Sequence, residues 1–139
     1  MKTILVGYDE SEAAERALAR AAELAVAFDA KVIVTSVAQV LVGAAAARGI
    51  GPIDPVDTPA MHHEELEHAA AFLDERGVQA EYIVTLGGAA AEILELAESR
   101  EADLIVVGTR DASLLERLLD PSVSRAVHRK AHCDVLVVH

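Results

Sequence analysis

Short apolar runs alternate along the chain with longer segments whose apolar residues recur every three or four positions. The short runs have the length and composition of β-strands, and they cover residues 3–8, 31–37, 78–85, 103–107 and 134–139. The longer segments have the period of amphipathic helices, and they cover residues 12–28, 59–76, 90–97 and 121–131. The sequence therefore predicts strands joined one to the next by helices.

The predicted helices have recognisable ends and one apolar face each. Ser11 is expected to cap the first helix, and Thr58 precedes Pro59 at the start of the second, which stops at Gly77. The residues expected on buried faces are Ala14, Ala17, Leu18, Ala21, Leu24, Ala25, Phe28, Leu66, Ala69, Ala70, Leu73, Ala90, Ile93, Leu94, Ala97, Val123, Ala126 and Val127.

This alternation predicts an α/β fold of the Rossmann-like, doubly wound type, with a five-stranded parallel sheet and helices on both faces. The run 103–107 is wholly apolar and is expected at the centre, whereas 78–85 is less apolar and is expected at an edge. Ligands of such folds bind at the carboxyl ends of the strands, where the winding reverses. If the first strand lies beside the fourth, Asp9 and the loop that starts at Gly108 share that crevice.

Residues 38–57 have no clear period, and they are long for a connection inside a single domain spanning 1–139. They contain three glycines and two prolines. Three interpretations stay open: a mobile lid over the crevice, a loop that binds a partner, or a disordered surface excursion.

The composition narrows the possible partners. The chain is 53% hydrophobic, so it has enough apolar residues for a core, and its net charge of −11 disfavours binding to nucleic acid or to an anionic membrane. Cys133 is the one cysteine, which excludes an internal disulfide and favours a reducing compartment. The apolar run near the N-terminus is too short for a signal peptide or a membrane helix. We expect a cytoplasmic protein.

Three groups of residues could carry other chemistry, and a structural explanation is preferred for each. His62, His63 and His68 lie with Glu64 and Glu67 on the second helix; without a third ligand, a solvated acidic face is expected and no metal site.

Ser122 and Ser124 lie near His128, but the Gly-x-Ser-x-Gly turn of a serine nucleophile is lacking, so no catalytic residue is assigned. Cys133 is expected to be a small buried core residue.

The opening ILVGYDESEAAERALARAAELA, the run DLIVVGTR and the closing LLERLLDPSVSRAVHRKAHCDVLVV together resemble the universal stress protein family over nearly the whole chain. The resemblance implies a five-stranded α/β fold, usually a homodimer. Many members of this family bind ATP, and others do not.

The ATP-binding members carry a pattern of Gly, two residues, Gly, nine residues, Gly, then Ser or Thr. Here the four positions are Gly108, Asp111, Pro121 and Ser122, so the spacing is kept and two of the three glycines are replaced. The resemblance further implies that Asp9 matches the acidic residue that contacts the nucleoside, and that Val37 falls near a position lining the adenine.

Both replacements oppose a phosphate. A carboxylate at Asp111 about 5 Å from a phosphate oxygen costs roughly 3 kcal/mol at an effective dielectric of ~20, which is about a hundredfold in affinity. Mg²⁺ between the two would reverse that sign. Pro121 has no N–H to donate, and Asp120 is placed to cap the helix and occupy the N–H groups near Ser122 and Val123.

The sequence thus predicts a universal stress protein that acts by association, without catalysis and without a required cofactor, and with impaired or absent ATP binding. The alternative is an ATP-binding protein, with Mg²⁺ and with or without slow hydrolysis, that uses Asp9, Val37, Gly108, Thr109, Ser122 and Val123. The expected partners are an unidentified protein and a second copy of this chain, paired through the apolar strand from Asp134 to His139.

Overall fold

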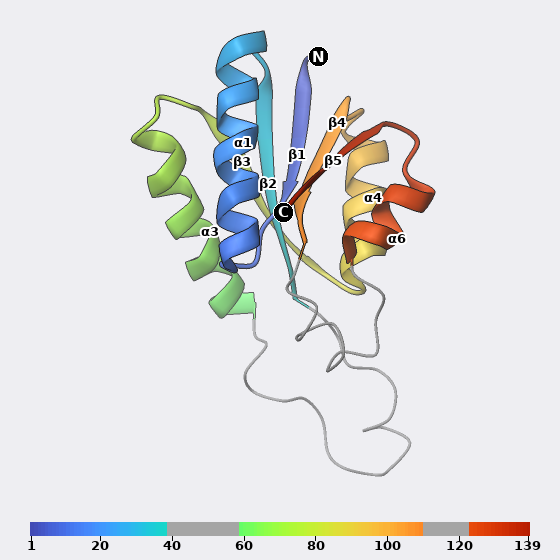
Figure 1. Cartoon of the computed structure of the whole chain (residues 1–139). Helices are drawn as coiled ribbons and strands as arrows, with labels where there is room; N and C mark the ends of the chain where they lie inside the picture. Colours follow the sequence, from blue (N-terminus) through green and yellow to red (C-terminus); the bar gives the residue numbers. More distant parts are fainter. Residues whose placement is uncertain (39–58, 110–122) are drawn as a thin grey trace.

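The computed structural model describes residues 1–38, 59–109 and 123–139, which form one parallel sheet covered by helices on both faces (Figure 1). In chain order the elements are β1 (Thr3–Gly7), α1 (Glu12–Phe28), β2 (Lys31–Ala38), α3 (Pro59–Asp74), β3 (Ala80–Leu86), α4 (Ala89–Ser99), β4 (Leu104–Gly108), α6 (Val123–Lys130) and β5 (Asp134–Val138). The predicted fold class is confirmed, and each strand lies within two residues of its predicted bounds.

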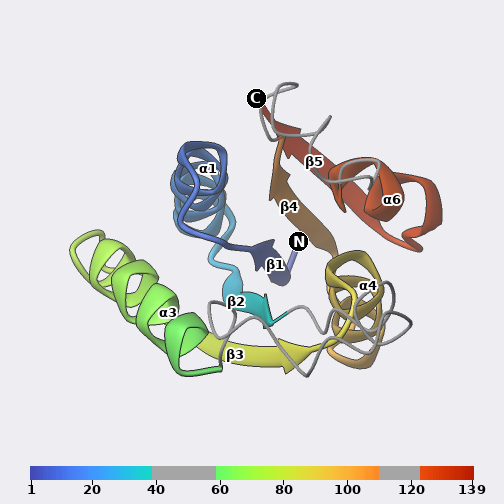
Figure 2. The same cartoon turned by 90° about the horizontal axis from the view of Figure 1, so that it is seen from below.

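The strand order is β3-β2-β1-β4-β5, and every neighbouring pair is parallel. The winding reverses between β1 and β4, which pair directly with Leu5 opposite Ile105. The expected adjacency of the first and fourth strands is therefore confirmed, and so is the edge position of β3. Figure 2 shows α1 and α3 on one face of the sheet and α4 and α6 on the other.

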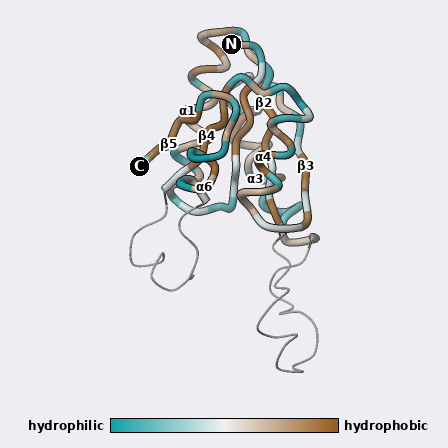
Figure 3. Tube along the Cα trace, turned by 90° about the vertical axis from the view of Figure 1, so that its right-hand side faces the viewer, coloured by the Kyte–Doolittle hydropathy of each residue, from teal (hydrophilic) through white to brown (hydrophobic). Residues whose placement is uncertain are grey.

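Two apolar layers hold the sheet between its helices. Ile4, Val6 and Val106 point toward α1 and α3, while Leu5 and Ile105 point toward α4 and α6, and all five side chains are fully buried. Hydrophobic residues accordingly follow β2 and β4 through the middle of the molecule (Figure 3). Burial on both faces explains why the central strands are uninterrupted apolar runs in the sequence.

Helix α1 begins at the predicted residue, but its last residue is not buried as predicted. The Ser11 hydroxyl accepts a hydrogen bond from the Ala14 N–H at 3.1 Å, which confirms the predicted N-cap. The prediction that Phe28 is buried is wrong, because its side chain is 55% exposed. Phe28 is the last residue of the helix, and the buried stripe ends one turn earlier at Ala25.

The other predicted helices differ in smaller ways. Leu66, Ala69 and Leu73 are buried as expected, whereas Ala70 is half-buried. Thr58 lies outside the described residues. So does most of the segment 38–57, except for Ala38, which is the last residue of β2. Within the described part of the chain, no helix has both the length and the apolar character needed to span a membrane.

Gly108, the last residue of β4, lies against the backbone of α1. A Cβ atom at this position would stand 2.5 Å from both the carbonyl carbon and the oxygen of Ala13. Only a residue without a side chain allows this approach of helix and strand. Packing thus requires a glycine here whether or not the crevice holds a ligand.

The start of β1 is tied to the start of β4. The carboxylate of Asp103 accepts hydrogen bonds from the N–H groups of Lys2 at 2.8 Å and Thr3 at 2.9 Å. These bonds favour the ionised form and lower the pKa of Asp103 below its usual value of 3.8.

We expect Gly108→Ala to lower the free energy of unfolding by about 1–3 kcal/mol, because the added methyl group overlaps backbone atoms that cannot move independently. Urea denaturation measures this change. Gly88→Ala is the matched control, since a Cβ at Gly88 meets nothing within 4 Å. Equal stability of Gly108→Ala and the wild type would contradict the packing requirement.

We expect Asp103→Asn to remove a pH-dependent part of the stability. Because the folded pKa is lowered, the stabilisation is present above the unfolded pKa and is lost as the pH falls through the folded value. Urea midpoints of the wild type and Asp103→Asn should therefore differ at pH 6 and converge as the pH falls through the lowered folded pKa of Asp103. Asp134→Asn, at the β5 position that pairs with Leu104, is the matched control and should leave the wild-type profile unchanged; a constant gap between Asp103→Asn and the wild type at all pH values would contradict the assignment.

Candidate functional site

The predicted nucleotide residues that the structure describes gather at the carboxyl ends of three neighbouring strands. Asp9 follows β1, Val37 is next to last in β2, and Gly108 ends β4 before Thr109. The β1 strand is held against β2 up to Tyr8, whose N–H donates to the Thr35 carbonyl at 2.9 Å. These positions therefore lie at the carboxyl ends of the strands beside the reversal of winding, which is where folds of this kind bind ligands.

The Asp9 carboxylate is partly buried and has a defined orientation. Its Oδ1 atom accepts a hydrogen bond from the Ser11 N–H at 3.1 Å. This places negative charge beside the first turn of α1, where the positive end of the helix dipole favours it. Asp9 is therefore anchored to the backbone on one side while it remains at the edge of the crevice.

The other described positions are engaged in the fold as well. The half-buried Val37 side chain packs into the layer beneath α4 and α6. The Thr109 N–H donates to the Val138 carbonyl at 2.8 Å, and its Oγ1 lies 3.3 Å from the His139 Nδ1. These bonds join the beginning of the predicted phosphate loop to β5.

The rest of the predicted phosphate site falls on residues 110–122. Asp111, Asp120, Pro121 and Ser122 lie outside the described residues, and Val123 is the first residue of α6. The roles assigned to them stay predictions from the sequence. Of the motif glycines, Gly108 is described, and its contact with Ala13 gives it a structural function of its own.

The prediction of a solvated histidine face on α3 is wrong for His62, which is 8% exposed. Its Nδ1 atom lies 2.5 Å from the Ser36 Oγ and 3.0 Å from the Glu65 Oε2, while the Ser36 hydroxyl donates to that same carboxylate at 2.6 Å. The three side chains form a polar cluster between α3 and β2 that satisfies hydrogen-bonding groups away from water.

The sequence contains the signal that would have placed His62 inside. It precedes the buried Leu66 by four residues and Ala69 by seven, so it lies on the same face of α3. His62 was predicted to be exposed because its side chain is polar, although the helical spacing puts it on the buried face. His63 and His68, off that stripe, are exposed as expected.

Several carboxylates lie near His68 and Tyr8. The side chain of His68 contacts the carboxylate of Glu10, the residue after Asp9. Tyr8 lies buried nearby, and burial together with the charges of Glu15, Glu10, Glu65 and Asp9 raises the pKa of its hydroxyl to about 12. The phenol is therefore neutral at physiological pH and cannot serve as a base.

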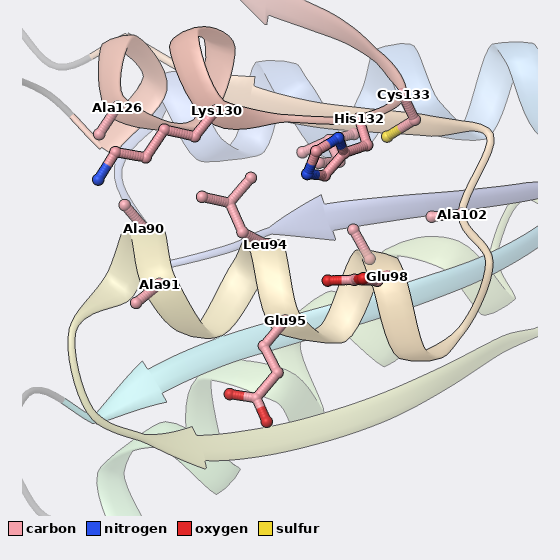
Figure 4. Close-up of a pocket in the computed structure, with 12 residues that line it drawn as sticks. Ala90, Ala91, Leu94, Glu95, Glu98, Ala102, Ala126, Lys130, His132 and Cys133 are labelled. Carbon is pink, nitrogen blue, oxygen red and sulfur yellow. The ribbon is translucent and has the colours of Figure 1, made fainter.

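Helices α4 and α6 enclose a groove of about 600 Å³ on the opposite face of the sheet (Figure 4). Leu94 and Ile105 contribute to its apolar lining, and Cys133 also lines it. Cys133 is half-buried rather than fully buried, and burial raises the pKa of its thiol, followed by the charge of Asp134. None of the described residues predicted to bind nucleotide lines this groove.

The described side chains were also compared with the arrangement that a metal ion needs. No group of three or more His, Cys, Asp or Glu residues in 1–38, 59–109 and 123–139 is placed to hold a metal ion. His128 is exposed on α6.

Comparison with known proteins agrees with this architecture. Residues 1–139 match the family model described as "Universal stress protein family". The chain is 44% identical over 75 residues to universal stress protein MJ0531 of Methanocaldococcus jannaschii, and 44% identical over 73 residues to universal stress protein YxiE of Bacillus subtilis. These alignments cover 54% and 52% of this chain, and 44% and 49% of the relatives, so the match spans about half their length.

Solved structures match over nearly the whole chain. A universal stress protein in complex with cAMP shares 29% identity with a TM-score of 0.75, and the match covers 99% of this chain and 97% of that one. A universal stress protein of Archaeoglobus fulgidus in complex with dAMP shares 25% identity with a TM-score of 0.73, covering 100% and 98%. The family model and the strand order agree: the chain belongs to the universal stress protein family.

Proposed function

We propose that this chain is a non-catalytic universal stress protein that acts by association, and that its crevice binds ATP weakly or not at all. The contact between Gly108 and Ala13 carries the proposal. Gly108 is the one glycine kept from the phosphate-binding pattern, and packing against α1 is sufficient to require it. The presence of this glycine is thus no evidence for a phosphate site.

The chemistry of the replaced positions points the same way. Asp111 adds a carboxylate to the loop that would surround the phosphates, and Asp120 with Pro121 leaves fewer N–H donors at the start of the following helix. The charge alone weakens binding by roughly a hundredfold unless Mg²⁺ intervenes. Asp9 and Glu10, which follow β1 at the carboxyl ends of the strands, add negative charge, so the binding of an anion there is disfavoured further.

A second candidate is an adenine nucleotide with a single phosphate. The candidate is supported by the two residues that the family resemblance assigns to the nucleoside, since Asp9 is held by Ser11 and Val37 is next to last in β2. Two structurally similar proteins were solved with cAMP and dAMP, each of which carries one phosphate. Such a ligand depends less on the residues that replace the glycines.

We further infer a cytoplasmic homodimer that pairs through β5. Within the described residues β5 pairs only with β4, and its apolar side chains are half-buried. The Val138 carbonyl accepts from Thr109 beside β4, so the backbone groups of Val137 point to the opposite, open edge. An apolar strand with an open edge favours association, and pairing about a twofold axis would cover it.

We expect calorimetry with Mg-ATP at about 1 mM to show no binding, or a Kd of roughly 100 µM or weaker, because of the charge and the missing donors. AMP, titrated in parallel, separates the two candidates: measurable AMP binding favours the second, and its absence favours a site without nucleotide. Micromolar binding of Mg-ATP would contradict the proposal and support the alternative in which Thr109, Ser122 and Val123 contact the phosphates.

We expect size-exclusion chromatography with light scattering to give a dimer at micromolar concentration. Val137→Pro should shift it to monomer, because proline removes an N–H that points away from β4. Val137→Ala is the matched control, since it trims the same side chain and keeps the N–H. A wild-type monomer, or a dimeric Val137→Pro variant, would contradict pairing through β5.

A further inference from the structure

Tyr8, the residue that follows β1, is buried but has a hydroxyl that the fold does not use. The residue is 6% exposed, and its N–H donates to the Thr35 carbonyl of β2 at 2.9 Å. Within the described residues its hydroxyl forms no hydrogen bond. The described hydroxyls that lack a partner and are shielded from solvent are those of Tyr82 and Thr85. The Tyr8 hydroxyl is not one of them, so its oxygen is open to solvent and to a ligand.

Carboxylates from three parts of the fold surround the Tyr8 hydroxyl. Two belong to the connection that follows Tyr8, one to the first turn of α1, and one to α3. The α3 carboxylate, Glu65, is fixed beside β2 by the Ser36 hydroxyl, which donates to it at 2.6 Å. The charges of all four act on the phenol, and together with Tyr8 these residues form what we call the Tyr8 cluster: Glu15, Glu10, Glu65 and Asp9.

The described neighbours of these carboxylates do not balance their charge. Glu10 contacts His68, and the Glu65 Oε2 atom lies 3.0 Å from the His62 Nδ1. Among the described residues, no lysine or arginine forms an ion pair with Glu10, Glu15 or Glu65. Even with both histidines protonated, these three carboxylates keep a net negative charge. A cation that carries hydrogen-bond donors would reduce this charge and also give the phenol oxygen a partner.

We propose that the Tyr8 cluster is a binding site for a small aliphatic diamine, one ammonium group of which donates to the Tyr8 hydroxyl. A primary ammonium has three N–H donors and no acceptor, so it matches an oxygen surrounded by carboxylates. A metal ion is a poorer match, because no group of three or more His, Cys, Asp or Glu residues in the described ranges is placed to hold one. The carboxylates are distributed over the connection, α1 and α3, so the second ammonium of a diamine interacts with those that the first does not reach.

Titration with putrescine, followed by NMR of the tyrosine rings, tests the site. The chain has two tyrosines, and Tyr82, whose hydroxyl is shielded from solvent, is the internal control. In about 0.15 M salt, which screens distant charges, the Tyr8 ring signals should shift along a saturable curve while those of Tyr82 stay in place. Butylamine, which has one ammonium group, should bind more weakly than putrescine. No Tyr8 shift at about 10 mM putrescine, equal shifts of both rings, or equal affinity for butylamine would overturn the proposal.

Three variants separate the Tyr8 cluster from the general acidity of the chain. Tyr8→Phe keeps the ring and removes the hydroxyl, so it should weaken putrescine binding about three- to tenfold, the loss of one hydrogen bond, and leave the urea midpoint unchanged. Glu15→Gln, at an exposed helix position, should weaken binding about two- to fivefold. Glu95→Gln removes the same charge from an exposed position on α4, across the sheet, and should bind as the wild type does. Wild-type affinity in both Tyr8→Phe and Glu15→Gln, or an equal loss in Glu95→Gln, would overturn the proposal.

Discussion

The contact between the last residue of β4 and the first turn of α1 determines the geometry of the crevice. Gly108 brings the strand backbone against Ala13, and small residues such as Ala17 and Ala21 continue the close approach along the helix. This packing fixes the start of α1 beside the end of β4. Asp9, which leads into that helix, and Thr109, which leaves that strand, therefore share one edge of the sheet. No side chain larger than hydrogen at Gly108 would preserve the arrangement.

The predicted site residues fall into two groups relative to this contact. On the side that the family resemblance assigns to a nucleoside, a bond from the Ser11 N–H orients Asp9, and Val37 lies next to last in β2. On the phosphate side, the sequence replaces flexible glycines with a carboxylate and a proline. The described positions depend on core packing, whereas the proposed phosphate chemistry depends on Asp111, Asp120 and Pro121, whose roles are predictions from the sequence. A family resemblance therefore shows the architecture more securely than the ligand.

The sequence predicted those features that local chemistry or periodicity determines. The apolar runs located all described strands, Ser11 was recognised as a cap, and the weaker hydrophobicity of 78–85 placed it at the edge. Features that depend on distant neighbours were missed. The burial of His62 requires Ser36 and Glu65 as partners, and the exposure of Phe28 depends on where the sheet stops covering α1. The packing requirement for a glycine at position 108 was not predicted, because the same glycine also fits a phosphate-binding motif.

The central claim is that the frame of the crevice is intact and that the residues at two loop positions prevent tight ATP binding. The most direct measurement is calorimetry of Mg-ATP with the double variant Asp111→Gly, Pro121→Gly beside the wild type. Removing the carboxylate and restoring an N–H donor should raise ATP affinity by at least about tenfold, and up to about a hundredfold. Equal affinity of the double variant and the wild type would contradict the claim.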